Sequence, residues 1–94
     1  MKTIAHWING KPAEGVSGRQ SPVYDPATGI QAKQTPLASV DEVDAAIAAA
    51  KDAYATWGTS SLAKRSTILF KFRALLDAHR DEIAALITAE HGKV

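Results

Sequence analysis

Histidine and acidic side chains are the residues of this sequence with the clearest capacity for acid–base or metal chemistry. His79 and Glu82 are three positions apart, so a helix would place them on one face, as half of a metal site. Because metal sites need three or four convergent ligands, we favour a solvated pair instead. His91, beside Glu90, lies near an expected helix end and suits a capping role. His6 is isolated.

Nucleophiles and phosphate-binding loops are scarce. A serine nucleophile needs a base held by a third group, and no such set can be assigned to Ser60, Ser61 or Ser66. We expect the first two to cap a helix. Residues 15–18, GVSG, lack the GxGxxG spacing and the following helix of a dinucleotide loop. The sequence has no cysteine, which excludes a cysteine nucleophile within it. We therefore assign no catalytic, cofactor-binding or metal-ligating residue.

Charge and hydropathy narrow the classes of partner. Eleven Lys and Arg against ten Asp and Glu give a net charge of +1 over 94 residues, which disfavours nucleic-acid binding. A basic set on the second expected helix could meet an anionic partner, but a solvated face is the interpretation we favour. Its members are Lys64, Arg65, Lys71 and Arg73. No apolar run approaches the ~18 residues of a membrane span. Since no secretory signal is visible, we expect a cytoplasmic protein, or a mitochondrial-matrix protein in a eukaryote.

Prolines divide the sequence into a strand segment, 1–38, and a helical segment, 39–94. All four prolines precede residue 39, and proline is excluded from helix interiors. Two hairpins are expected in the first segment. One joins strands 6–8 and 11–14 through Asn9-Gly10, a pair suited to a type I′ turn. The other joins strands 21–24 and 30–35 through residues 25–29, DPATG.

Capping signals and apolar spacing predict three helices in the second segment. Ser39 and Glu42 form a capping box before the first helix, and Gly58 is its expected C′ residue. The second helix begins near Ser60 or Ser61. The third spans about 80–90, after an uncertain break at 78–79, and Gly92 caps it. The expected apolar stripes are Val43, Ile47, Ala50, Tyr54 and Trp57; Leu62, Ile68, Leu69, Phe72, Leu75 and Leu76; and Ile83, Leu86 and Ile87.

Two helix faces suggest additional neighbours beyond a small three-helix unit. The first helix carries alanines opposite its stripe, which either admit another backbone or simply raise helix propensity. They are Ala45, Ala48, Ala49 and Ala55. Phe70 projects roughly opposite the stripe of the second helix. We favour a second neighbour over a simply exposed aromatic there.

An ordered set of short motifs resembles the N-terminus of the aldehyde dehydrogenase superfamily. The motifs are WINGK at 7–11, DPATG at 25–29, VDAAI at 43–47 followed by Ala50, Ala53 and Trp57, Arg65 with Ile68-Leu69, and TAEHGK at 88–93. A narrower resemblance is to the CoA-acylating methylmalonate-semialdehyde dehydrogenases. It is carried by GVSGR at 15–19, LAS at 37–39, ILFKFR at 68–73 and ITAEHGK at 87–93.

The resemblance implies a parent enzyme several times longer, with a Rossmann-like cofactor domain, a catalytic domain and an oligomerisation arm. In that family a cysteine thiolate attacks the aldehyde, hydride passes to NAD, and in the subgroup CoA takes the acyl group. Those catalytic and cofactor-binding residues would all lie beyond Val94. The chain is then an α+β fragment of the larger α/β fold, an incomplete N-terminal part of the cofactor-binding domain.

Several expectations follow from the resemblance. The chain by itself would bind neither NAD nor CoA and would not catalyse the reaction. Its partners would be the remainder of the parent enzyme and further copies of it, in a homo-oligomer that is a tetramer in the family, with no nucleic acid and no membrane. The alternative hypothesis is an independent helical module that binds a partner protein through the face around Phe70.

Overall fold

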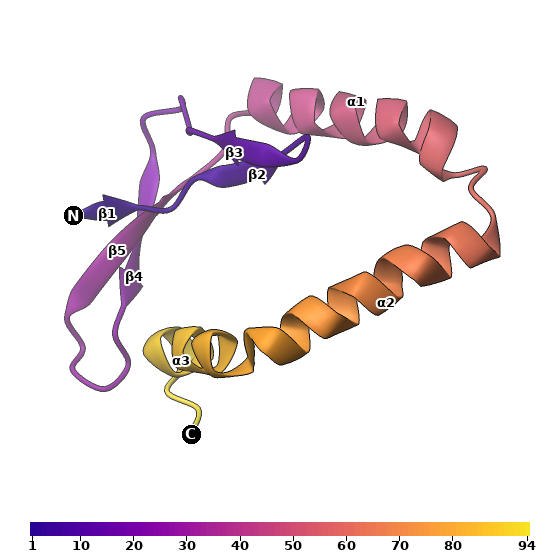
Figure 1. Cartoon of the computed structure of the whole chain (residues 1–94). Helices are drawn as coiled ribbons and strands as arrows, with labels where there is room; N and C mark the ends of the chain where they lie inside the picture. Colours follow the sequence, from indigo (N-terminus) through magenta and orange to yellow (C-terminus); the bar gives the residue numbers. More distant parts are fainter.

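The computed structural model describes all residues, 1–94, as a strand unit followed by three long helices (Figure 1). This confirms the predicted α+β class. The strands are β1 (Lys2–Thr3), β2 (His6–Ile8), β3 (Lys11–Ala13), β4 (Gln20–Tyr24) and β5 (Gln31–Pro36). The helices are α1 (Val40–Trp57), α2 (Leu62–Ala78) and α3 (Arg80–His91). None of the helices combines the length and apolarity that a membrane span requires.

Both predicted hairpins are present. Strands β2 and β3 pair antiparallel around a turn in which Asn9 has φ 54° and Gly10 has φ 75°, the two positive values that a type I′ turn needs. Strands β4 and β5 pair antiparallel around the second turn, where the Ala27 amide donates to Asp25 Oδ1 at 2.8 Å. Gly29 closes that turn with φ 72°.

Strand β1 was not predicted. Its two residues pair parallel with β5, Lys2 opposite Lys33, so the sheet order is β1-β5-β4. A two-residue strand has no alternation that a sequence could display, and its partner is some thirty positions away. Strand β5 therefore lies at the centre of this sheet, while β2 and β3 form a separate two-stranded ribbon.

The helix caps are formed as predicted, with one difference. The Glu42 amide donates to Ser39 Oγ at 3.2 Å, and the Ser39 amide donates to Glu42 Oε1 at 3.0 Å. Ser61 caps α2, and Gly92 ends α3 with φ 79°. The prediction for Gly58 was wrong in conformation, because this residue is right-handed at φ −61°. A Cβ on Gly58 would lie 2.6 Å from the Tyr54 ring, so lack of space, and not handedness, requires glycine.

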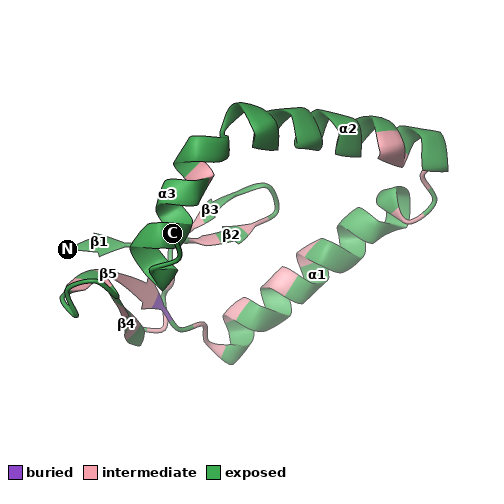
Figure 2. Cartoon of the chain, turned by 90° about the horizontal axis from the view of Figure 1, so that it is seen from below, coloured by how far each residue is buried: buried purple, intermediate pink, exposed green.

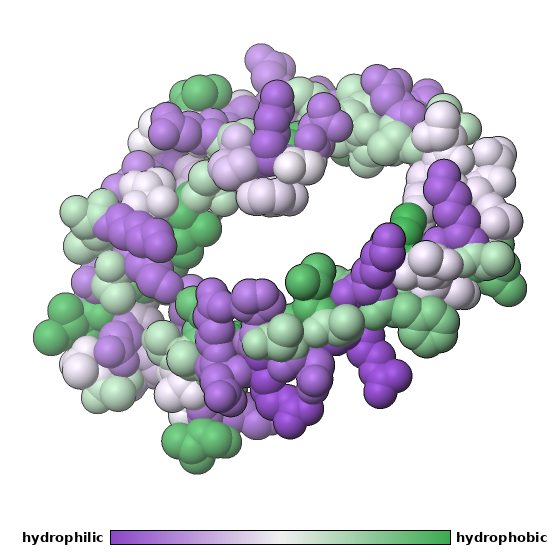
Figure 3. Space-filling view, in the orientation of Figure 1, coloured by the Kyte–Doolittle hydropathy of each residue, from purple (hydrophilic) through white to green (hydrophobic).

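The helices do not pack as a three-helix unit. They run around an opening that passes through the middle of the molecule (Figure 3). The radius of gyration is 17.0 Å, against ~12 Å for a folded domain of this length. The molecule is only 15 Å thick along its shortest axis, little more than one helix with its side chains.

The open ring leaves the chain without a hydrophobic core. A single residue of the 94 is buried, and it is Pro36 at the end of β5 (Figure 2). The apolar stripes expected to face an interior are exposed to solvent along the helices, except for the half-buried Ile83 of α3. The sequence therefore carries the apolar spacing of buried helix faces, but the 94 residues form no interior that buries those faces.

The C-terminal end of α3 returns to the strand unit and closes the ring. Lys33 Nζ on β5 lies 3.1 Å from Glu90 Oε1 on α3. A Cβ on Gly92 would lie 3.3 Å from Pro26 Cγ in the second hairpin turn. The strand unit thus contacts the start of α1 at one side and the end of α3 at the other. The division into segments 1–38 and 39–94 as domains stays a prediction.

Gly15 generates the first testable prediction. A Cβ there would overlap Pro36 Cβ and lie 3.0 Å from Pro36 Cγ and 3.3 Å from His6 Nε2. Because the proline ring cannot move aside, we expect Gly15→Ala to lower the free energy of unfolding of the full-length protein by ~1–3 kcal/mol. Urea denaturation measures this loss. The same substitution in a Pro36→Gly background should cost clearly less, and equal costs in both backgrounds would rule out this clash.

Candidate functional site

Glu42 joins the start of α1 to the strand unit. Its Oε1 accepts the Ser39 amide at 3.0 Å, and its Oε2 accepts the Val16 amide at 3.2 Å. His6 Nε2 on β2 lies 3.6 Å from the same Oε2. The Glu42 side chain is only 14 % exposed, in a chain where nearly everything else is open to solvent. We call these four residues the latch.

The latch stabilises the charged form of Glu42. The hydrogen bond from the Ser39 amide is the largest cause that lowers the pKa of Glu42 below its ordinary 4.5. Desolvation opposes this shift, while the Val16 amide, the Ser39 side chain and the charge of His6 act in the same direction as the main bond. His6 Nε2 is inaccessible to solvent and makes no hydrogen bond of normal length. The carboxylate of Glu42 therefore ties three chain segments together while ionised.

Arg65 holds the corner between α1 and α2. Its Nη2 donates to the carbonyl of Trp57 at 3.0 Å and to that of Gly58 at 2.9 Å. Its Cζ lies 5.6 Å from the centroid of the Trp57 ring, within cation–π range. The carbonyl groups at the C-terminal end of α1 thus accept hydrogen bonds from a cation, whose charge also suits the negative end of the helix dipole. The expectation of a solvated face was wrong for Arg65.

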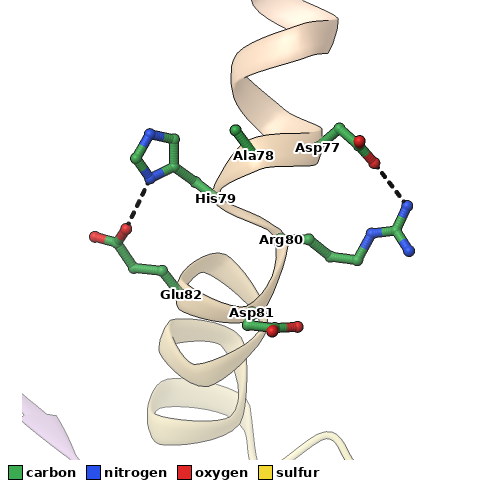
Figure 4. A pocket seen from close by; sticks show the side chains of 6 residues that line it. All are labelled: Asp77, Ala78, His79, Arg80, Asp81 and Glu82. Carbon is green, nitrogen blue, oxygen red and sulfur yellow. Dashed lines mark hydrogen bonds and ion pairs between the residues drawn. The ribbon is translucent and has the colours of Figure 1, made fainter.

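His79 and Glu82 lie together at the junction of α2 and α3 (Figure 4). His79 Nδ1 is 3.0 Å from Glu82 Oε2, and Arg80 Nη2 is 2.8 Å from Asp77 Oδ1. All four side chains are more than half exposed, so each pair contributes little to stability. This is the solvated pair that the sequence favours. No group of three or more potential ligands in the chain could hold a metal ion.

The remaining candidates occupy local structural roles. Ser61 Oγ accepts the Lys64 amide as the N-cap of α2. The prediction that Ser60 also caps a helix was wrong, because its Oγ donates to the Thr56 carbonyl at 3.4 Å. In the GVSG loop, the hydroxyl of Ser17 donates to the carbonyl of Leu37. This loop leads into strand β4 and not into a helix. His91 ends α3, while Ser66 makes no side-chain hydrogen bond.

Alanines on and beside the apolar stripe of α1 lie opposite the first hairpin. A hollow between them is lined by Trp7, Ile8, Asn9 and Gly10 from the hairpin and by Ala46, Ala49, Ala50 and Ala53 from α1. Small side chains therefore do face another piece of backbone, although the alanines involved are only partly those expected. Of the opposite set that the sequence singles out, only Ala49 lines this hollow.

Helix α2 exposes apolar side chains on more than one face. Phe70 is 68 % exposed, and Phe72, on another face, is 55 % exposed. An aromatic residue opposite the apolar stripe is what a helix with neighbours on two sides would carry.

Two contacts in these sites escaped sequence analysis. The capping box identifies one oxygen of Glu42, but nothing local shows that the other reaches Val16 and His6. Arg65 carries no sequence signal for its position against the end of α1, which lies across the connection between the two helices. Both contacts join segments that are separated in the chain. The periodicity of apolar residues carries no information about how such segments meet.

Comparisons with known proteins point to one family. A family model described as the aldehyde dehydrogenase family matches residues 13–94. The chain is 43 % identical over 93 residues to malonate-semialdehyde dehydrogenase 3 of Geobacillus kaustophilus, covering 99 % of this chain and 19 % of that protein.

Solved structures agree with the sequence comparison. A methylmalonate-semialdehyde dehydrogenase from Oceanimonas doudoroffii superimposes with a TM-score of 0.92 at 44 % identity, over 97 % of this chain and 18 % of that one. A Sinorhizobium meliloti protein, assigned as a methylmalonate-semialdehyde dehydrogenase and complexed with NAD, gives 0.93 at 35 % identity, with the same coverage. The chain spans less than a fifth of the length of these relatives.

The latch predicts a pH-dependent stability. A lowered pKa means that Glu42 stabilises the fold fully above its unfolded value, 4.5, and loses this contribution as the pH falls through the folded value. In the full-length protein, Glu42→Gln should therefore lower the urea midpoint most near neutral pH. The difference between wild type and variant should shrink as the pH falls below 4.5. Asp52→Asn, which changes an exposed carboxylate of α1 that pairs with no other side chain, is the control. A difference that stays constant with pH would contradict this role.

The corner at Arg65 predicts a graded loss of stability. Arg65→Ala removes both carbonyl bonds and the stacked cation, so we expect ~2 kcal/mol less unfolding free energy in the full-length protein. Arg65→Lys keeps the charge but not the planar fork, and should cost ~1 kcal/mol. Arg73→Ala, on the exposed surface of the same helix, should stay within ~0.5 kcal/mol. Chemical denaturation compares the three, and equal effects of Arg65→Ala and Arg73→Ala would exclude a corner function.

Proposed function

The chain belongs to the aldehyde dehydrogenase family, and we propose that it is the N-terminal scaffold portion of an NAD-dependent, CoA-acylating methylmalonate-semialdehyde dehydrogenase. The observation that carries the proposal is a likeness over almost the whole chain to semialdehyde dehydrogenases about five times its length. The absence of a hydrophobic core supports the same conclusion, because the exposed apolar stripes need the rest of a larger protein to cover them.

The GVSG loop of this chain does not fit the phosphates of a dinucleotide. The GVSG loop is followed by a strand, and its serine hydroxyl is engaged by the Leu37 carbonyl, so neither a phosphate-binding turn nor a free helix N-terminus follows it. No cysteine is available to hold an acyl group. In this proposal NAD, CoA and the thiolate all belong to the remainder of the parent enzyme, and residues 1–94 support that part.

The choice of aldehyde rests on the relatives. Two solved relatives are named for methylmalonate semialdehyde and another for benzaldehyde. The curated relatives are named for malonate semialdehyde, which lacks one methyl group of methylmalonate semialdehyde. In the proposed reaction the semialdehyde is oxidised while NAD accepts the hydride, the acyl group passes to CoA, and the free carboxylate of the substrate leaves as carbon dioxide, so that methylmalonate semialdehyde gives propionyl-CoA. We also propose that the parent enzyme is a cytoplasmic homo-tetramer, or a mitochondrial-matrix one in a eukaryote, as the family resemblance implies.

Activity of the full-length enzyme tests the proposed function. With methylmalonate semialdehyde, NAD and CoA, we expect NADH to form together with propionyl-CoA, identified by mass spectrometry. Malonate semialdehyde, giving acetyl-CoA, compares the two substrates. The purified 94-residue chain is the matched control and should produce no NADH, since it lacks a thiolate. Release of the free acid without CoA consumption would contradict CoA acylation, and NADH formation by the 94-residue chain would overturn the scaffold proposal.

A further inference from the structure

The turn between β2 and β3 holds the single asparagine of the chain, directly before a glycine. Asn9 and Gly10 are both exposed, and a Cβ on Gly10 would meet no atom within 4 Å. Ile8 and Lys11 pair across the turn, and the Gly10 amide between them makes no hydrogen bond. An exposed carboxamide thus lies next to a free and unhindered main-chain amide, which is a pair of groups that can react.

The reaction open to this pair is deamidation through a cyclic imide. The Gly10 nitrogen attacks Cγ of Asn9, the new C–N bond closes a five-membered ring, and the C–N bond of the carboxamide breaks. The proton of the Gly10 amide leaves with the carboxamide nitrogen as ammonia. Water then opens the ring at one of its two carbonyl carbons and gives aspartate or isoaspartate. Water is the only co-reactant that these steps consume.

The backbone of the folded turn keeps the reacting atoms apart. Asn9 has φ 54°, in the left-handed region, where ψ is about +30 to +50°. Ring closure requires the Gly10 nitrogen and the Cβ of Asn9 to lie on the same side of the Cα–C bond, because both become members of one five-membered ring. At a positive ψ of this size, an L-residue places them on nearly opposite sides. Asn9 must therefore leave the left-handed region before it can react.

We propose that Asn9 is a deamidation site which the type I′ turn protects, so that the reaction proceeds only when the ribbon of β2 and β3 opens. This ribbon pairs with no third strand, and a two-stranded ribbon is marginally stable by itself. The latch holds it at His6, 3.6 Å from Glu42 Oε2. Opening of the turn is thus a local event with a lower free energy than global unfolding.

Isoaspartate cannot rebuild the same turn. It adds a methylene group to the main chain, in a connection that closes with only two residues between Ile8 and Lys11. The aspartate product adds a negative charge beside the hollow that Asn9 shares with the alanines of α1. Each opening that ends in deamidation therefore leaves a permanent chemical mark on the first hairpin. The inference depends on the backbone of this hairpin and not on the substrate of the parent enzyme.

Mass spectrometry of the full-length protein tests this site. Trypsin releases residues 3–19 as one peptide, since it does not cleave before Pro12, and this peptide contains Asn9 but no glutamine. In mildly alkaline buffer, Asn9 in the folded protein should deamidate at least ~tenfold more slowly than in a synthetic peptide of residues 3–19. This factor corresponds to ~1.4 kcal/mol for local opening. Enzymatic methylation of isoaspartate identifies the product.

Two substitutions at Lys11 separate the turn from its local sequence. Lys11→Pro removes the amide that closes the turn, so Asn9 should deamidate several-fold faster than in the wild type. Lys11→Thr keeps this amide and suits a strand, so it should leave the rate unchanged. Wild-type protein in urea, at concentrations below its global unfolding transition, should show the same acceleration and does not depend on the folding of a variant.

The opposite results overturn the inference. A synthetic peptide that does not deamidate would show that Asn9 is no such site. A folded wild-type protein that reacts less than ~tenfold more slowly than the peptide would show that the turn gives no protection. Equal rates for Lys11→Pro and Lys11→Thr, or a wild-type rate that urea does not change, would separate the reaction from opening of the ribbon and would also reject the proposal.

Discussion

This structure depends on one constraint: its helices carry apolar faces, but the chain forms no interior that could bury them. The three helices carry stripes at helical spacing, as helices that face a core do. The ring that they form with the strand unit is one layer thick and surrounds an opening (Figure 3). Burial of apolar surface is the main favourable term in folding, so a chain that leaves these stripes open depends on other parts of a protein to cover them.

Polar contacts at the corners give the open ring its shape. Glu42 fixes the start of α1 to the loop at Val16 and to β2, and Arg65 fixes the end of α1 to the start of α2. Lys33 and Glu90 close the circuit between sheet and α3. The last pair is partly exposed and contributes little energy, whereas the sheltered carboxylate and the forked guanidinium each satisfy backbone groups. Local polar contacts thus set the angles between the elements. The exposed apolar faces, in contrast, require other parts of a protein to cover them.

This division of roles suits an N-terminal portion of an aldehyde dehydrogenase. The chain brings no thiolate and no dinucleotide loop, and its strong likeness to semialdehyde dehydrogenases covers less than a fifth of their length. A frame with polar joints and apolar inner faces can position a larger catalytic part without contributing a reacting group.

The amino-acid sequence by itself determined the local structure and the family. The turns at Asn9-Gly10 and at Asp25, and the caps at Ser39, Ser61 and Gly92, follow from preferences that act over a few residues. Only the tertiary structure decided the pairing of β1 with β5, the right-handed backbone of Gly58 against the Tyr54 ring, and the reach of Arg65 and Glu42 to distant segments. It also decided that the helices surround an opening, and the physical reason is common to all of these. Such contacts join residues far apart in the chain, and apolar periodicity shows which face is to be buried but not what will bury it.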